Sequence, residues 1–527
     1  MIPVMKSGAT SPSALLANPD ETSGDAPANA ESDPQVSPSG PRSAQGLVLR
    51  NAALLVAAQV VGMPLSILVN ALMARHLGAG DFGYIYLATT FASFGFLLVD
   101  WGQAGTLPAM VTRERARAGE LFGTGLAWRL GSAVIVYGVL AVSCHLLGFG
   151  TDFQIALALV CLACTLAAFM SAMQDTIRGF ERTDVAAYQL IGVQLLTALL
   201  VVPTLLLGGR LRAALTAQAL ASAIVAVFVW RALRAMSIGR LSFRPKVLRR
   251  FLSEGTPFLS LSLVNALQPN IDAVFLSKLA PAEVVGWHGA ARKLVGVLVF
   301  PAASLISALY PTLCRLFSED IVEFRRSVGG ALRTSTILVV PVALGCGLYA
   351  DIGIRIFSRA SFGPAEDNLR VLSVFVFLLY FSMILGSALA AAGLQRSWAV
   401  IQGACVAVSM LLDPLLVPWF GLHYGNGGLG VCVSTVVSEI FMVAGGFWLA
   451  PKGVIDRALV RGIALAAGAG AVMVLTARLL AGAPSFLAAP ISVAAYAVCL
   501  WLIGGLDEEQ TGMIRGIIAR KLARRRT

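Results

Sequence analysis

Two adjacent basic residues, Arg292 and Lys293, lie inside a long apolar stretch, Val285–Thr312. Ionisable residues are costly to place in hydrocarbon, so within such a stretch they are candidates for function. Neighbouring residues on a helix point about 100° apart, so we expect at least one of the two to face the interior of a helix bundle. There it could bind a phosphate or an acidic sugar. The alternative is that both reach outwards to lipid headgroups.

Two further polar residues occupy matching places in apolar stretches. Asn70 precedes Leu77 by seven residues, and Asp272 precedes Leu279 by seven. Both are candidates for substrate contact. Asp272 could pair with Arg292 or carry a coupling proton, and a purely structural hydrogen bond between helices would explain it equally well.

Five more charged residues are candidates for binding, ion coupling or gating. Asp100 and Arg129 lie near the ends of apolar stretches and could form a charge pair at the inner mouth, with Arg129 also able to meet substrate. Asp413 and Glu439 could form a cation site, and Arg75 could contact an arriving head group. Anchoring at the membrane interface is the simpler account of Arg75, Arg129 and Asp100, and a hydrogen-bonded pair is the simpler account of Asp413 and Glu439.

The elements that must position these residues follow from composition. The chain has 527 residues, of which 57% are hydrophobic and 13% charged, and its mean hydropathy is +0.79. Globular proteins carry about 25% charged residues, so a soluble enzyme of several domains is excluded. A membrane-crossing helix needs about 20 apolar residues, and lipid cannot satisfy exposed backbone groups. The predicted fold class is therefore an all-α polytopic membrane protein.

Fourteen apolar segments are predicted to cross the membrane as helices. They are Asn51–Met73, Phe82–Gln103, Leu121–Leu147, Phe153–Gln174, Ala186–Leu207, Ala213–Trp230, Thr256–Ser277, Val285–Thr312, Ser335–Ile354, Val371–Ala392, Trp398–Phe420, Gly428–Ala450, Gly462–Leu480 and Phe486–Ile503. The predicted organisation is a disordered cytoplasmic tail (1–45), a six-helix bundle (46–235), a basic cytoplasmic linker (236–255), a second six-helix bundle (256–450), two additional helices (451–505) and a basic cytoplasmic tail (506–527).

The distribution of basic residues predicts the orientation. Alternate connections between the segments carry 29 of the 40 Lys and Arg residues, and the other connections carry 8. Because basic residues collect in cytoplasmic loops, both termini are expected in the cytoplasm. The same bias explains the net charge of +12 without any nucleic-acid partner.

Two pairs of matching stretches indicate an internal duplication. Leu77–Tyr84 resembles Leu279–Trp287, and Gly179–Thr183 resembles Gly393–Ser397, with offsets of 203 and 214 residues between corresponding glycines. The first twelve helices are therefore interpreted as two copies of a six-helix unit, related by a pseudo-two-fold axis along the membrane normal. Transporters of this build bind substrate between their halves and open alternately to each side.

Several of these motifs resemble those of Wzx-type polysaccharide flippases, which belong to the multidrug/oligosaccharidyl-lipid/polysaccharide exporter superfamily. The stretch Ala74–Tyr84 and the tripeptide Asp100-Trp101-Gly102 carry the resemblance in the first half. In the second half it is carried by Gly255–Phe258, Ile271-Asp272, Val285–Trp287, Tyr310-Pro311, Tyr424–Gly428 and Ser438-Glu439. The likeness covers about 47–503, and Asp413 departs from it where an Asn is more usual.

The resemblance implies a flippase in the plasma (inner) membrane of a bacterium. Its substrate would be a polyprenyl-phosphate-linked oligosaccharide, moved from the cytoplasmic to the outer leaflet within membrane lipid. A polysaccharide polymerase and assembly proteins are further conceivable partners. No Gly-Lys dipeptide occurs, which excludes the phosphate-binding loop of ATP-driven pumps. Energy would therefore come from an ion gradient, the substrate gradient or a partner, and no cofactor or metal is expected.

Three alternatives remain open on the sequence alone. A multidrug/cation antiporter of the same superfamily would be expected to have an acidic cavity with few cations. A peptidoglycan-precursor flippase would also use a cationic cavity. A non-transporting scaffold for polysaccharide assembly is the third, because the last two segments lie outside the duplication. A membrane enzyme is not expected, since the outer connections are too short for a catalytic domain.

Overall fold

The computed structural model describes residues 41–505 except positions 181, 183, 237 and 358. Most of the predicted N-terminal tail and all of the predicted C-terminal tail lie outside these residues. The described part consists of helices and short connections, without a β-strand. In chain order the helices are α1 (Pro41–Asp100), α2 (Gln103–Arg113), η1 (Arg115–Arg117), α3 (Ala118–Leu146), α4 (Thr151–Gly179), α5 (Asp184–Leu206), α6 (Leu211–Arg234), α7 (Pro245–Leu279), α8 (Ala282–Leu298), α9 (Phe300–Glu319), α10 (Ile321–Leu348), α11 (Ala350–Phe357), α12 (Arg359–Phe362), α13 (Ala365–Ala391), α14 (Gln395–Tyr424), α15 (Gly427–Leu449), α16 (Arg457–Leu479) and α17 (Ser485–Leu502).

The 60-residue helix α1 contains a sharp break at Gly78 and is in effect two helices. Gly78 has φ 79° and ψ 176°, a conformation that a residue without a Cβ adopts at little cost. The break separates the first two predicted segments. A second break, at Val299, separates α8 from α9 within the predicted segment Val285–Thr312. Pro301 follows it and cannot donate a helical hydrogen bond.

The all-α polytopic prediction is confirmed. Twelve helical stretches of the described chain are long and apolar enough to cross a membrane. The first of them, Ala57–Arg113, includes the predicted segment Phe82–Gln103 and most of Asn51–Met73, and α7 is not among the twelve. The count of fourteen crossings therefore stays a prediction.

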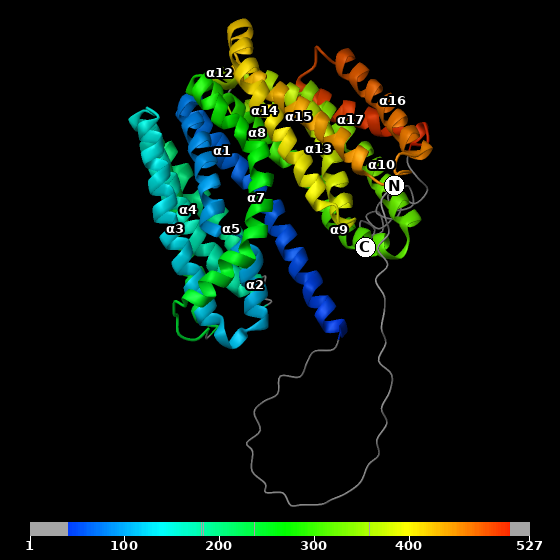
Figure 1. Ribbon diagram of the computed structural model, residues 1–527. Coiled ribbons are helices and arrows are strands. Elements are labelled where there is room, and N and C mark those ends of the chain that lie inside the picture. The colour runs from blue at the N-terminus through cyan, green and yellow to red at the C-terminus, as the bar shows by residue number, and fades with distance from the viewer. Residues whose placement is uncertain (1–40, 181, 183, 237, 358, 506–527) are drawn as a thin grey trace, which may run out of the picture. The chain divides into compact units, whose positions relative to one another are not determined.

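The helices of the second compact unit, residues 51–527, pack in two groups (Figure 1). In the first half, α4 packs on α3 and α6, and α5 packs on α6. In the second half, α13 packs on α10 and α15, and α14 packs on α15. Helices α16 and α17 contact each other, and α16 also covers α10. The start of α7 contacts α2 and α3, whereas the whole helix makes its most extensive contact with α14.

The two halves meet through matched positions of the duplication. A Cβ at Gly83 of α1 would lie 2.0 Å from the Ala282 carbonyl oxygen of α8, and a Cβ at Gly286 would lie 2.1 Å from the Ala79 carbonyl oxygen. Both glycines and both alanines are 203 residues apart. Only glycine permits backbones to approach so closely, so the repeated glycines join the two copies where they cross.

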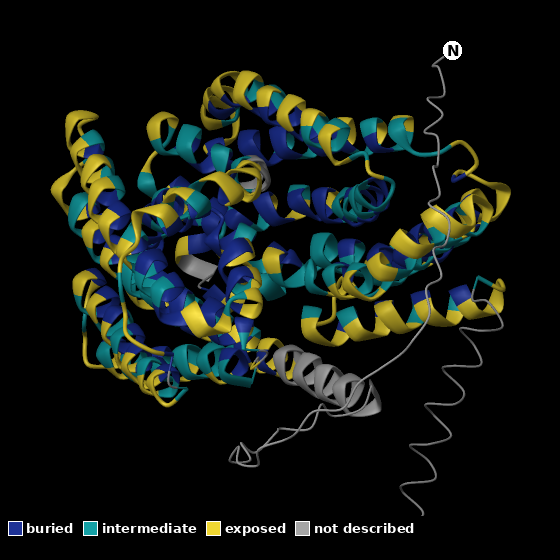
Figure 2. Cartoon of the chain, turned by 60° about the horizontal axis from the view of Figure 1, so that its bottom comes forward, coloured by how far each residue is buried: buried dark blue, intermediate teal, exposed yellow. Residues whose placement is uncertain are grey.

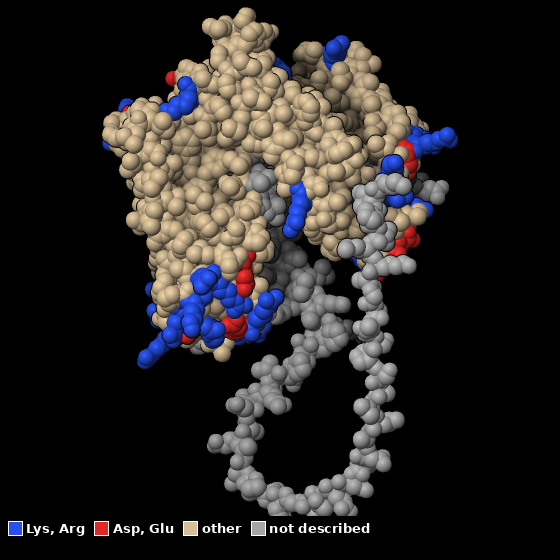
Figure 3. All heavy atoms as spheres, in the orientation of Figure 1, with Lys and Arg blue, Asp and Glu red and all other residues tan. Residues whose placement is uncertain are grey.

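The outside of the bundle is suited to lipid. Figure 2 shows that many outward-facing positions are exposed, and large apolar side chains such as Leu207 and Trp448 are among them. On the face drawn in Figure 3, charged side chains gather mainly near one end. Arg250 of α7 donates a 2.5 Å hydrogen bond to Glu114, which follows α2, and this bond lowers the pKa of Glu114 below its ordinary value. The linker therefore lies on the same side as the α2–α3 connection, as the orientation rule requires.

Candidate functional site

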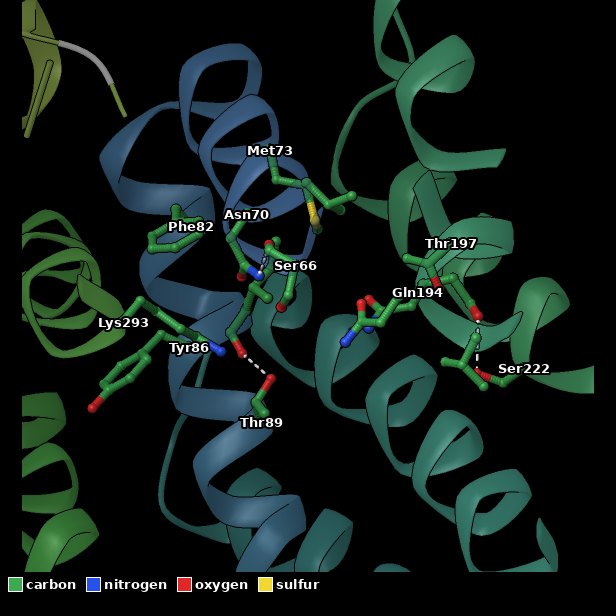
Figure 4. A pocket seen from close by; sticks show the side chains of 14 residues that line it. Ser66, Asn70, Met73, Phe82, Tyr86, Thr89, Gln194, Thr197, Ser222 and Lys293 are labelled. Atoms are coloured by element: carbon green, nitrogen blue, oxygen red, sulfur yellow. Dashed lines mark hydrogen bonds between the residues drawn. The ribbon is translucent and has the colours of Figure 1, made fainter. Parts of the chain in front are cut away.

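A polar cavity of about 200 Å³ lies between α1, α5, α6 and one residue of α8 (Figure 4). Its lining combines a single cation, Lys293, with hydroxyl and amide groups and with the aromatic rings of Phe82 and Tyr86. No Asp or Glu occurs among the described residues that line it. The hydroxyl and amide groups belong to Ser66, Asn70, Thr89, Gln194, Thr197, Gln218 and Ser222.

Lys293 crosses from the second half of the chain to a cavity built by the first half. Figure 4 shows its side chain extending from α8 towards α1, beside Tyr86. The residue is exposed, and part of its accessible surface lines the cavity. An accessible ammonium group without a carboxylate in the cavity lining is suited to bind an anion.

Arg292 points in another direction, towards an acidic cluster in the second half. Its guanidinium lies 5.4 Å from the ring centroid of Phe375. It is also within electrostatic reach of Asp272 and within hydrogen-bonding reach of the Tyr86 hydroxyl. The two adjacent cations thus serve different surroundings, as the 100° step between helical neighbours predicts. The structure brings Arg292 and Asp272 together, while Asn70 lies apart from them in the polar cavity.

Asp272 is within electrostatic reach of a second buried carboxylate, Asp413 of α14. The Thr435 hydroxyl donates a 2.7 Å hydrogen bond to one oxygen of Asp272. The other oxygen of Asp272 and both oxygens of Asp413 have no hydrogen-bond partner in the described chain, although Ser434 is near Asp413. Two neighbouring buried carboxylates do not both remain ionised without compensation. A bound cation or a proton would compensate the second charge.

Glu439 has surroundings of its own. Its carboxylate accepts a hydrogen bond from Ser382 of α13. The predicted pairing of Asp413 with Glu439 stays a prediction, and Asp413 is also within electrostatic reach of Asp272. Helix rotation decides which polar residues meet, and apolar segments reveal little about it.

Arg129 forms a buried ionic triad with Asp100 and Asp175. Its guanidinium lies 2.5 Å from Asp100 and 2.8 Å from Asp175, and none of its side chain is exposed. The interpretation of Arg129 as an interface anchor is therefore wrong, and it does not line the polar cavity. The predicted Asp100–Arg129 pair is present. Asp175 is the member that the sequence analysis missed.

Arg75 connects the two halves near the Gly83–Gly286 crossing. It donates hydrogen bonds to the carbonyl oxygens of Phe357 and Arg355 at the end of α11, at 3.0 and 2.8 Å. Phe82 packs edge-on against Phe357 at 5.9 Å between ring centroids. Arg75 therefore satisfies the last carbonyls of a helix and lies outside the lining of the cavity.

An apolar groove of about 510 Å³ flanks the polar cavity. It is lined by α1, α8, α10, α11, α13 and α17, almost entirely through aliphatic side chains. Ser66 and Lys293 line the polar cavity, whereas their chain neighbours Ile67 and Leu294 line the groove. The polar and apolar spaces therefore lie on two sides of the same helices.

No group of three or more His, Cys, Asp or Glu residues in the described chain is arranged to hold a metal ion. The carboxylates of Asp272 and Asp413, with the neighbouring hydroxyl of Thr435, are oxygen donors of the kind that hard cations prefer.

Comparison with protein families decides the assignment. The family described as "Polysaccharide biosynthesis protein" matches residues 48–317, just over half of the chain. The chain belongs to this family. The match agrees with the resemblance to Wzx-type polysaccharide flippases of the multidrug/oligosaccharidyl-lipid/polysaccharide exporter superfamily. None of the curated proteins matches the sequence.

Solved structures show the fold of the same superfamily. The lipid II flippase MurJ in an inward closed conformation has a TM-score of 0.67 at 13% identity, over 86% of this chain and 98% of that one. An inward-facing multidrug resistance transporter of the MATE family has a TM-score of 0.59 at 16% identity, over 73% and 94%. An outward-facing multidrug resistance transporter of the MATE family has a TM-score of 0.51 at 16% identity, over 76% of this chain and 95% of that one. This member of the polysaccharide biosynthesis family thus shares the fold of these transporters, and its described helices include twelve stretches suited to cross a membrane.

The amides of α5 and α6 were not among the site residues predicted from the sequence. Gln194 and Gln218 lie in segments whose other residues are mainly apolar. Uncharged polar residues in a membrane helix are a weaker signal than charges, because they can bond to a neighbouring helix. A search for amides in predicted crossings would have found both.

Proposed function

We propose that this chain is a flippase that moves a lipid-linked oligosaccharide, a polysaccharide repeat unit, from the cytoplasmic to the outer leaflet of the plasma membrane. Transport takes place by alternating access and is driven by an ion gradient. Both termini lie in the cytoplasm, and a polysaccharide polymerase and assembly proteins act on the exported unit.

The pairing of a cationic polar cavity with an apolar groove carries the proposal. A lipid-linked sugar has a charged, hydroxyl-rich head and a hydrocarbon tail, which require opposite surroundings. Lys293 and the polar lining suit the head, and the aliphatic groove beyond α1 and α8 suits the tail. One substrate molecule could occupy both spaces because neighbouring residues of the same helices line them.

The carboxylates Asp272 and Asp413 support ion coupling. A coupling cation, Na⁺ or a proton, would neutralise their mutual repulsion. Arg292 is within electrostatic reach of Asp272 and precedes Lys293, so the cation site and the substrate site share α8. Binding at one site would then affect the other through this helix.

The lining argues against the multidrug/cation antiporter. A cavity for organic cations is expected to carry acidic residues and few cations, whereas the described lining has Lys293 and no acidic residue. A peptidoglycan-precursor flippase shares the lipid-linked phosphate and differs in the sugar. A scaffold without transport would need neither a cation in the cavity lining nor the cavity itself.

Complementation tests the proposed function. In a strain lacking the gene, lipid-linked oligosaccharide should build up on the cytoplasmic leaflet, and the wild-type chain should restore export. Lys293→Ala should abolish restoration while folded protein remains in the membrane, because the phosphate loses its counter-charge. The exposed Lys452→Ala, which lies in the α15–α16 connection, is the matched control.

Two outcomes would reject the proposal. Unchanged polysaccharide in the deletion strain together with altered dye efflux would indicate the antiporter. Full export by Lys293→Ala would remove the cavity from the transport path.

A further inference from the structure

Three helices of the first half each contribute an amide side chain to the polar cavity. Asn70 comes from α1, Gln194 from α5 and Gln218 from α6. Figure 4 shows the Gln194 amide directed across the cavity towards α1, the helix that carries Asn70. An amide offers donors and an acceptor together, which matches the hydroxyl groups of a sugar ring.

The polar groups of the lining differ in whether they already form hydrogen bonds within the protein. The Asn70 amide donates to the Ser66 carbonyl oxygen at 2.8 Å, and the Thr89 hydroxyl donates to its own helix at 2.7 Å. The Ser222 hydroxyl likewise donates to a backbone carbonyl. By contrast, the side chains of Gln194 and Gln218 have no hydrogen-bond partner among the described residues. These two amides are therefore available to a ligand.

The charge and size of the cavity limit what it can hold. Lys293 is the single cation of its described lining, and a phosphate would use that charge. A carboxylate-bearing sugar next to the phosphate would have no cation left. At about 200 Å³ the cavity is smaller than the ~300–1,000 Å³ of common ligand pockets. In this conformation it has room for one sugar unit and not for a whole oligosaccharide.

We infer that the cavity is a subsite for one uncharged sugar, the unit attached directly to the lipid phosphate, and that Gln194 and Gln218 determine which sugar is accepted. This inference rests on the proposed function and adds the substrate class. Lys293 binds the phosphate common to all substrates, and the two glutamines bind ring hydroxyls. The remaining sugars of the unit lie outside the cavity.

Transport of single-sugar substrates tests the inference. The purified full-length protein is placed in liposomes with prenyl diphosphate-linked hexose or with the set of its monodeoxy analogues. An added phosphodiesterase that cannot cross the membrane releases radiolabelled head groups from the outer leaflet. The wild-type chain should prefer the hexose over the analogue that lacks a contacted hydroxyl, by roughly threefold to tenfold for each hydrogen bond.

Gln194→Leu and Gln218→Leu should each slow hexose transport roughly threefold to tenfold. Transport of the analogue that lacks the hydroxyl bound by the replaced glutamine should not change, so the ratio of hexose to analogue transport falls to about one. Lys293→Ala should slow all substrates alike. Gln189→Leu is the control, because Gln189 lies on α5 outside the cavity lining. An unchanged preference, or equal slowing of hexose and analogues in the glutamine variants, overturns the subsite. Failure of the wild-type chain to transport any lipid-linked sugar instead overturns the proposed function.

Discussion

Arg129 shows how a membrane protein can bury a charge at the centre of a bundle. Nη2 of the guanidinium donates hydrogen bonds to carboxylates from α1 and α4, whereas Nε and Nη1 have no hydrogen-bond partner among the described residues. Breaking a buried ion pair by removing one partner costs much more than the pair contributes, because the remaining charges stay buried. The triad is therefore a strict requirement of the first half.

Arg129→Ala should destabilise the protein strongly. Asp100 and Asp175 would remain buried as like charges, and the expected loss is about 3–5 kcal/mol. Thermal unfolding of the purified protein in detergent measures it. Arg182→Ala removes an exposed pair with Asp184 and should cost no more than about 1 kcal/mol. Equal unfolding temperatures of the two variants would contradict a stabilising triad.

The paired carboxylates lead to a prediction about energy coupling. Asp272→Asn or Asp413→Asn removes one of two repelling charges, so the site no longer needs a cation. In liposomes, the transport rate of either variant should lose its dependence on a Na⁺ or pH gradient. Asp320→Asn is the control, because Asp320 caps the start of α10 and Asn caps equally well. A retained gradient response in both Asp272 and Asp413 variants would exclude this site from coupling.

At the scale of helices, the crossing of α1 and α8 controls how closely the halves approach. A methyl group at Gly83 or Gly286 would lie about 2 Å from a carbonyl oxygen, so the helices would have to separate. Gly83→Ala and Gly286→Ala should each reduce export. In an otherwise cysteine-free chain that carries Asn70→Cys, each should also increase the labelling of this cysteine by an impermeant maleimide added outside.

Gly131→Ala and Gly138→Ala of α3 are matched controls. A Cβ at either position meets nothing within 4 Å, so neither export nor labelling should change. Similar behaviour of all four alanine variants would show that the tight crossing has no part in closure.

Much of this helical framework could be predicted from the sequence, because hydropathy depends on composition alone. Each predicted segment lies largely in helix, and the repeated Gly83 and Gly286 lie where the two copies cross. The sequence could not predict that Arg292 faces Asp272 while Lys293 faces the other half. That division depends on helix rotation and packing, which a nearly uniform apolar pattern does not specify. Asp175, which binds Arg129, was missed for the same reason.

For the whole molecule, the distribution of basic residues makes a testable prediction about topology. A fluorescent protein fused to the C-terminus should be bright, because it folds in the cytoplasm, and alkaline phosphatase inserted after Gly482 should be active. Fusions truncated after Arg240 and after Ala280 decide whether α7 crosses. If the chain crosses fourteen times, the reporters of the two fusions lie on opposite sides of the membrane. Reporters on the same side would mean that α7 does not cross and that there are fewer than fourteen crossings.

The reciprocal contact of Gly83 with Ala282 and of Gly286 with Ala79 has a consequence for how such a chain can change. Each repeat carries a glycine that approaches the other repeat and an alanine carbonyl that the other repeat's glycine approaches. This reciprocal arrangement is the pattern of an isologous interface between identical subunits. A six-helix ancestor with one such patch would already be self-complementary. Duplication and fusion would then only have to keep, within one polypeptide, a contact that two separate copies had made.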